Sequence, residues 1–186
     1  MWIHSPLILA AAWRLMSHAG YARMSMDAVA AEAEVTKPTI YRRYASKEQL
    51  ATAAVAAARE CTAAPPDTGD TRADLITQLH RFAAGASRAY GMSMIGTVLA
   101  EEHETPQLLS HFREDVVAPR RALFRAVLQR AQKRGELRDR VDIDLAINLL
   151  VGAFYAQYLE GRAFDTGWEE RVVDTVLTGI GRIRRP

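Results

Sequence analysis

Apolar residues recur along this chain at the three- and four-residue spacing of helices almost from end to end. The first such stripe follows Ser5 and fades near Gly20. Spacing of this kind places the apolar side chains on one helical face. Further helices are predicted from 25 to 33, from Thr36 over a short stretch, from Ser46 to about 58, and over 71–90, 92–103, 106–134, 142–160 and 167–183. Strand-like alternation is not convincing anywhere, so the chain is expected to be all-α, with about nine helices.

Several helix starts carry their own capping signals. Ser5-Pro6 places a capping hydroxyl before a proline in the first turn. Ser46 with Gln49 forms a capping box. Pro119 instead falls inside the periodic stretch 106–134. Because proline lacks the N–H that an interior helical position requires, we expect a kink or a split there.

The stretch APPDTGD, residues 64–70, is the clearest interruption of the helical pattern. Its prolines and glycine end one helix, and its aspartates can cap the next. We therefore expect a three-helix head over 1–50, a connecting helix that continues from Ser46 over 51–64, and a larger C-terminal domain over 65–186.

Composition excludes only a few classes of protein. The 186 residues are 49% hydrophobic and 25% charged, and the formal net charge is +2, as in ordinary globular proteins. Arginine outnumbers lysine by 21 to 3. The single cysteine, Cys61, excludes an internal disulfide. No uncharged run approaches the ~20 residues of a membrane span, so a cytoplasmic location without membrane association is expected.

The segment TKPTIYRRYASKEQL, residues 36–50, concentrates cationic and aromatic side chains on one short helix and the start of the next. A helical arrangement turns Val35, Ile40 and Tyr44 inward and leaves the others facing outward. Only Glu34-Val35 separates this helix from the preceding one, as in a helix-turn-helix. An ordinary solvated basic face is the alternative, but Pro38 and Tyr41 have no purpose on such a face, so DNA binding is favoured.

The stretch SMDAVAAEAEVTKPTIYRRYASKEQL resembles the signature of the TetR family of bacterial transcriptional regulators, with similarity over residues 8–54. The resemblance implies a homodimeric regulator, typically a repressor, that binds a pseudo-palindromic operator and is released by an effector. It also assigns DNA-contacting roles. Helix-capping and phosphate contacts fall to Ser25 and Thr36, base contacts to Lys37, Pro38, Thr39 and Arg42, and backbone contacts to Tyr41, Arg43 and Lys47.

Two positions depart from the family pattern. Glu34 stands where a glycine is usual, so either a non-glycine residue adopts the left-handed region or the turn is reshaped. The opening residues MWIHSP also lack the basic arm that often precedes the first helix.

The last two predicted helices are apolar on most of their circumference, which requires burial on several faces. Part of that surface belongs to the chain's own core, and the rest is predicted to form a four-helix interface between two copies. The residues expected in this dimer interface are Leu150, Phe154, Tyr158, Val172, Val176 and Ile180.

Stripes of methionine and aromatic residues on the intervening helices usually indicate core packing. The family resemblance, however, implies an effector cavity among these helices. Its expected lining is Gln78, Phe82, Met92, Ile95, Leu99, His111, Phe112 and Asn148. Because no cationic cluster belongs to this interior, the effector is expected to be small and hydrophobic or weakly polar.

The sequence does not assemble a catalytic or metal-binding set. EEHE at 101–104 lacks a second histidine at ligand spacing, and GMSMIG lacks the nucleophile elbow. We therefore expect no enzyme activity, no cofactor and no metal. The alternative function is an α-helical small-molecule-binding or interaction protein whose head no longer reads DNA.

Overall fold

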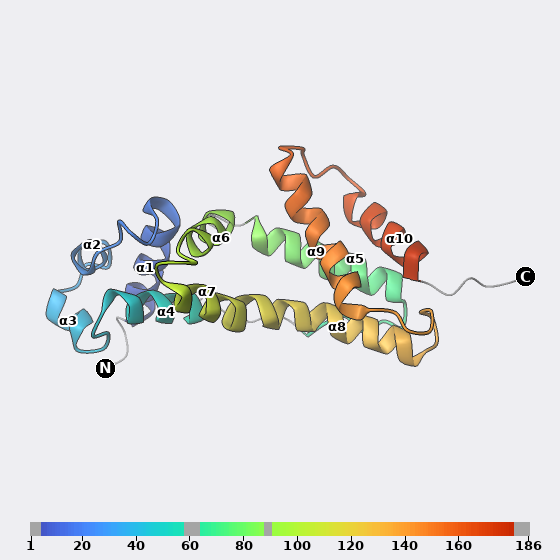
Figure 1. Cartoon of the computed structure of the whole chain (residues 1–186), viewed down its shortest axis with the longest axis horizontal. Helices are drawn as coiled ribbons and strands as arrows, with labels where there is room; N and C mark the ends of the chain where they lie inside the picture. Colours follow the sequence, from blue (N-terminus) through green and yellow to red (C-terminus); the bar gives the residue numbers. More distant parts are fainter. Residues whose placement is uncertain (1–4, 58–63, 88–90, 181–186) are drawn as a thin grey trace, which may run out of the picture. The chain divides into compact units, whose positions relative to one another are not determined.

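Figure 1 shows the computed structural model of the chain, which describes residues 5–57, 64–87 and 91–180. Over these residues the architecture is helical, which confirms the all-α prediction. The chain forms two compact units, Met1–Thr62 with Ala86–Pro119 and Ala63–Gly85 with Arg120–Pro186. Each unit is therefore assembled from two separate stretches of sequence. Cys61 lies outside the described residues.

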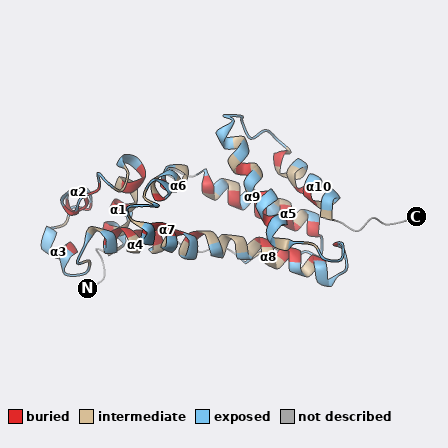
Figure 2. Cartoon of the chain, in the orientation of Figure 1, coloured by how far each residue is buried: buried red, intermediate tan, exposed pale blue. Residues whose placement is uncertain are grey.

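The first unit contains α1 (Ser5–Ala19), α2 (Met26–Glu32), α3 (Lys37–Tyr41), α4 (Lys47–Ala57), α6 (Gly91–Ala100) and α7 (Pro106–Phe112). Helix α4 packs against both α1 and α7, and α1 also packs against α6. All six helices carry buried residues, which are red in Figure 2. These residues form one core, which includes Ile8, Met16, Val29, Ile40, Leu50, Met94 and Leu108. Two helices of the predicted C-terminal domain thus share a core with the head. The division at 50 and 64 remains a prediction.

The second unit contains α5 (Thr71–Ala86), α8 (Ala118–Lys133), α9 (Ile143–Leu159) and α10 (Trp168–Ile180). Its centre is an aromatic cluster around Phe154, which has no exposed surface. The Phe154 ring lies 5.5 Å from Phe82, 5.0 Å from Phe164 and 6.5 Å from Trp168, centroid to centroid. The helix ends predicted at 90 and 183 lie outside the described residues.

The long predicted helix 106–134 is interrupted as its proline requires. A π-helical turn, η1 (Arg113–Val117), joins α7 to α8. The Ala118 N–H donates to the Arg113 carbonyl, five residues earlier. Pro119 follows directly and has no N–H to offer the ordinary four-residue ladder. The expected kink or split therefore takes the form of a widened turn.

Capping hydrogen bonds confirm several predicted helix starts. The Ala28 N–H donates to Ser25 Oγ at 3.1 Å, and the Gln49 N–H donates to Ser46 Oγ at 3.1 Å. Gln49 Oε1 completes the box one residue earlier than expected, by accepting from the Ala45 N–H at 3.0 Å. Among the described helices, none is long and apolar enough to cross a membrane.

Candidate nucleic-acid interface

Helices α2 and α3 form a helix-turn-helix whose inner side packs against the core of the first unit. Ile40, in the middle of α3, is fully buried. Val35 and Tyr44, on either side of α3, are partly buried and pack against the same core. This is the inward face that the spacing predicts, and its burial fixes which side of α3 meets solvent.

The turn between α2 and α3 depends on a left-handed residue. Glu34 has φ 53°, so the first of the two predicted alternatives holds. The Val35 N–H donates to the Ala30 carbonyl at 2.9 Å, and the Glu34 N–H donates to the Ala31 carbonyl at 3.2 Å. These two bonds close the end of α2 in the Schellman pattern, whose left-handed position usually carries glycine.

The outer face of α3 is open to solvent. The exposed residues are Lys37, Pro38, Tyr41, Arg42 and Arg43, and Thr39 is partly buried. Tyr41 keeps 53% of its surface exposed, although no core requirement places an aromatic ring there. Within the described residues, the Arg42 guanidinium has no hydrogen-bond or ion-pair partner. A planar fork on an open helical face is suited to bidentate contacts with guanine or phosphate.

Lys37, by contrast, is not an unpaired cation. Its Nζ forms an ion pair with Asp27 Oδ1, in the first turn of α2. Both side chains remain more than half exposed, at 55% and 62%. Sequence reasoning missed Asp27, because the two residues lie ten positions apart on different helices. Only the turn geometry brings them together.

The predicted capping role of Thr36 at the start of α3 is wrong. It occupies the position before α3, but its side chain makes no capping hydrogen bond to the backbone. Its hydroxyl instead lies 2.9 Å from the Thr39 hydroxyl. Pro38, which has no N–H, occupies the second position of α3 and removes one of the donors that a cap would satisfy.

Lys47, expected beside the DNA backbone, lies against its own protein. Its Nζ donates to the Ala22 carbonyl at 3.1 Å and lies 4.2 Å from the centre of the Tyr21 ring. Burial lowers the pKa of this ammonium, and the nearby Glu101 carboxylate partly opposes that effect. Lys47 thus ties α4 to the turn after α1. Its contact with a phosphate remains a prediction.

The residues predicted to line an effector pocket are divided between the two units. Phe112 is buried in the first unit's core, Met92, Ile95 and His111 are partly buried, and Leu99 is exposed. Gln78 and Phe82 are buried in the second unit. Asn148 is exposed, and its Oδ1 accepts from Arg121 at 2.7 Å. The grouping of these residues around one ligand remains a prediction.

The predicted dimer interface also needs correction. Leu150 and Phe154 have no exposed surface, and Val176 keeps only 6%. These three side chains pack inside the chain's own second unit, so they leave almost no surface for contact with a second copy. Tyr158 is exposed, whereas Val172 and Ile180 are partly buried. An all-round apolar helix gives no periodic signal that separates its inner from its outer side.

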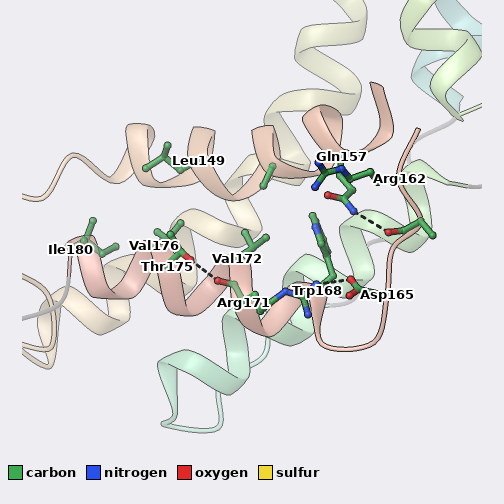
Figure 3. A pocket seen from close by; sticks show the side chains of 13 residues that line it. Leu149, Gln157, Arg162, Asp165, Trp168, Arg171, Val172, Thr175, Val176 and Ile180 are labelled. Atoms are coloured by element: carbon green, nitrogen blue, oxygen red, sulfur yellow. Dashed lines mark hydrogen bonds and ion pairs between the residues drawn. The ribbon is translucent and has the colours of Figure 1, made fainter. Parts of the chain in front are cut away.

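A groove of about 820 Å³ lies along α9 and α10 (Figure 3). Leu149, Val172 and Ile180 line its apolar part, and Gln157 and Arg171 line its polar end. No group of three or more metal-ligating side chains occurs in the described parts of the chain.

Comparison with known proteins assigns both parts of the chain. Residues 8–54 match the family model described as bacterial regulatory proteins, tetR family. Residues 65–176 match the model described as tetracyclin repressor-like, C-terminal domain. The chain belongs to the TetR family. It is a transcriptional regulator whose DNA-binding domain is the helix-turn-helix of α2 and α3.

Individual relatives agree with this assignment. An uncharacterized HTH-type transcriptional regulator of Mycobacterium tuberculosis is 37% identical over 147 residues, which cover 78% of this chain and 71% of the relative. The DNA-binding transcriptional repressor TetR of Mycobacteroides abscessus is 33% identical over 174 residues, covering 93% and 91%. The solved TetR-family regulator SCO0332 is 30% identical with a TM-score of 0.65, covering 94% and 96%.

Proposed function

We propose that this TetR-family regulator is a repressor that binds a pseudo-palindromic operator as a homodimer and is released by a small, largely apolar effector. The observation that carries the proposal is the outer face of α3, where Tyr41 and Arg42 stand exposed above the buried Ile40. An aromatic and cationic face on a rigid helix suits the major groove. The repressor role is supported by the Mycobacteroides abscessus relative, which is a DNA-binding transcriptional repressor.

The contacts with DNA divide into two kinds. Arg42, which is open and unpaired within the described chain, is placed to read guanine O6 and N7. Tyr41 and Arg43 flank it and are proposed to contact the phosphate backbone, as is Ser25 at the start of α2. Cytoplasmic location follows from this proposed role at the chromosome.

Selection from a pool of random DNA duplexes tests this function. The wild-type protein is expected to enrich an inverted repeat whose half-sites lie one helical turn apart, about 34–36 Å. Arg42→Ala is expected to lower affinity for the enriched duplex by about 1–3 kcal/mol per half-site and to relax the preference at one base pair. Sequencing of the bound pools measures both effects. A pool that stays random with the wild-type protein contradicts the function.

Dimerisation is proposed to occur through α9 and α10. Leu145, Leu149 and Tyr158 on α9 are about half exposed, at 54%, 52% and 46%, and Leu149 lines the groove in Figure 3. Burial of these side chains against a second copy would remove apolar surface from water. The two copies would then hold two α3 helices for successive major grooves.

The effector is proposed to contact Gln78, the one polar residue of the predicted lining that is buried. It keeps 3% of its surface, and its Oε1 has no hydrogen-bond partner in the described structure. Phe82, one helical turn further along α5, packs its ring against Phe154 and Tyr155. An apolar molecule with one hydroxyl or N–H donor suits such surroundings, because it would satisfy the amide oxygen.

Gln78→Met is expected to stabilise the protein without effector by about 1 kcal/mol, because it removes an unsatisfied acceptor at nearly constant volume. Thermal unfolding measures the change. Gln157→Met is the matched control, since Gln157 Nε2 donates to the Ala163 carbonyl at 2.9 Å and its loss should destabilise. Equal destabilisation by both substitutions would show that the Gln78 amide is already satisfied.

A further inference from the structure

The ion pair between Asp27 and Lys37 joins the two helices of the DNA-binding motif on its outer side. Lys37 is the first residue of α3, and Asp27 lies in the first turn of α2. Both side chains are more than half exposed, so neither is held there by packing. A pair in this position places a negative charge beside Lys37 on the exposed side of the motif.

We propose that Asp27 is a specificity-determining residue that suppresses binding to non-operator DNA by neutralising Lys37. The inference rests on the proposed operator binding and assigns a role to a residue that would not itself contact DNA. Affinity for non-specific DNA comes almost entirely from cations that displace condensed counterions from phosphates. A lysine whose charge is cancelled by a carboxylate contributes little to that process.

The same pair leaves direct base recognition possible. An ammonium has three N–H donors, and Asp27 occupies one of them. The remaining donors can reach guanine O6 and N7, which are neutral acceptors in the major groove. Lys37 can therefore remain paired with Asp27 while it donates to a base. Contact between Lys37 and a phosphate would instead replace the ion pair with Asp27 by an ion pair with the phosphate. The pair thus weakens the non-specific complex more than the specific one.

Asp27→Asn tests the inference by fluorescence anisotropy, with the enriched duplex and a shuffled duplex of equal length across a salt series. We expect affinity for the shuffled duplex to rise by roughly threefold per head, or about tenfold for a dimer. Its salt dependence should steepen by about 0.9 per head. Affinity for the enriched duplex should rise less, so the specificity ratio falls. Asp27→Glu should restore the wild-type ratio.

Glu32→Gln is the matched control, because it removes one carboxylate from the same helix and breaks the 3.0 Å pair with Arg14. It should leave the specificity ratio near that of the wild type. The Lys37→Gln background provides the second control, since Asp27→Asn should no longer change the ratio there.

Equal effects of Asp27→Asn and Glu32→Gln, an unchanged salt slope, or an effect that persists without Lys37 would each overturn the inference. A wild-type protein that binds both duplexes equally overturns the proposed function itself. That outcome is visible before any variant is measured.

Discussion

Leu149→Arg is expected to convert the proposed dimer to monomers and to lower operator affinity by at least about a hundredfold. Leu149 is 52% exposed on α9 and lines the groove along α9 and α10. A guanidinium at this position would have to be buried without a partner if two copies met there. Two half-sites would then be bound independently, and the gain from linking them, typically about 10²–10⁴, would be lost. Sedimentation and operator titration measure the two effects.

Leu99→Arg is the matched control for this prediction. Leu99 is exposed to the same degree, at 53%, but lies on α6 in the first unit. The same charge should therefore leave the mass in solution unchanged. If the wild-type chain sediments as a monomer at micromolar concentration, or if Leu149→Arg remains a dimer, the proposed interface is wrong.

Phe154→Ala is expected to destabilise the second unit by about 3–5 kcal/mol, because it empties the centre of a closely packed aromatic cluster. The ring is fully buried and packs against other aromatic rings, including Phe82 on α5 and Trp168 on α10. A cavity there would loosen the packing of three helices at once. Denaturant unfolding followed by tryptophan fluorescence measures the loss, and Trp168 reports on the cluster directly.

Phe164→Ala removes an identical ring from the edge of the same cluster. Phe164 stacks on Phe154 at 5.0 Å but is 39% exposed. Its removal leaves a site that water can fill, so a loss of only about 1 kcal/mol is expected. Equal losses for the two substitutions would mean that Phe154 is not the centre of the second unit.

The helical architecture was predictable because its signals are local. Ser25, Ser46 and Asp142 each accept from a backbone N–H three residues later, and such caps are visible in the sequence. The interruption at Pro119 was predictable for a similar reason, because the lack of a backbone N–H is a property of proline itself. The inward face of α3 was predictable from the spacing of Val35 and Ile40.

The contacts between distant residues were not predictable. Periodicity cannot separate the buried Phe154 from the exposed Tyr158, because α9 is apolar on most sides and both rings lie on it. The pair of Lys37 with Asp27, and the placement of Lys47 over Tyr21, depend on how the turns orient separate helices. The sequence therefore shows which residues carry a charge, but only the structure shows which residues they pair with.

Titration of the wild-type protein against the enriched duplex and its shuffled counterpart, at one salt concentration, tests the central claim most directly. Sequence-specific repression by a dimer predicts two chains per duplex and affinity at least about a thousandfold higher for the enriched sequence. Equal affinities for the two duplexes, or saturation with one chain per duplex, would contradict it.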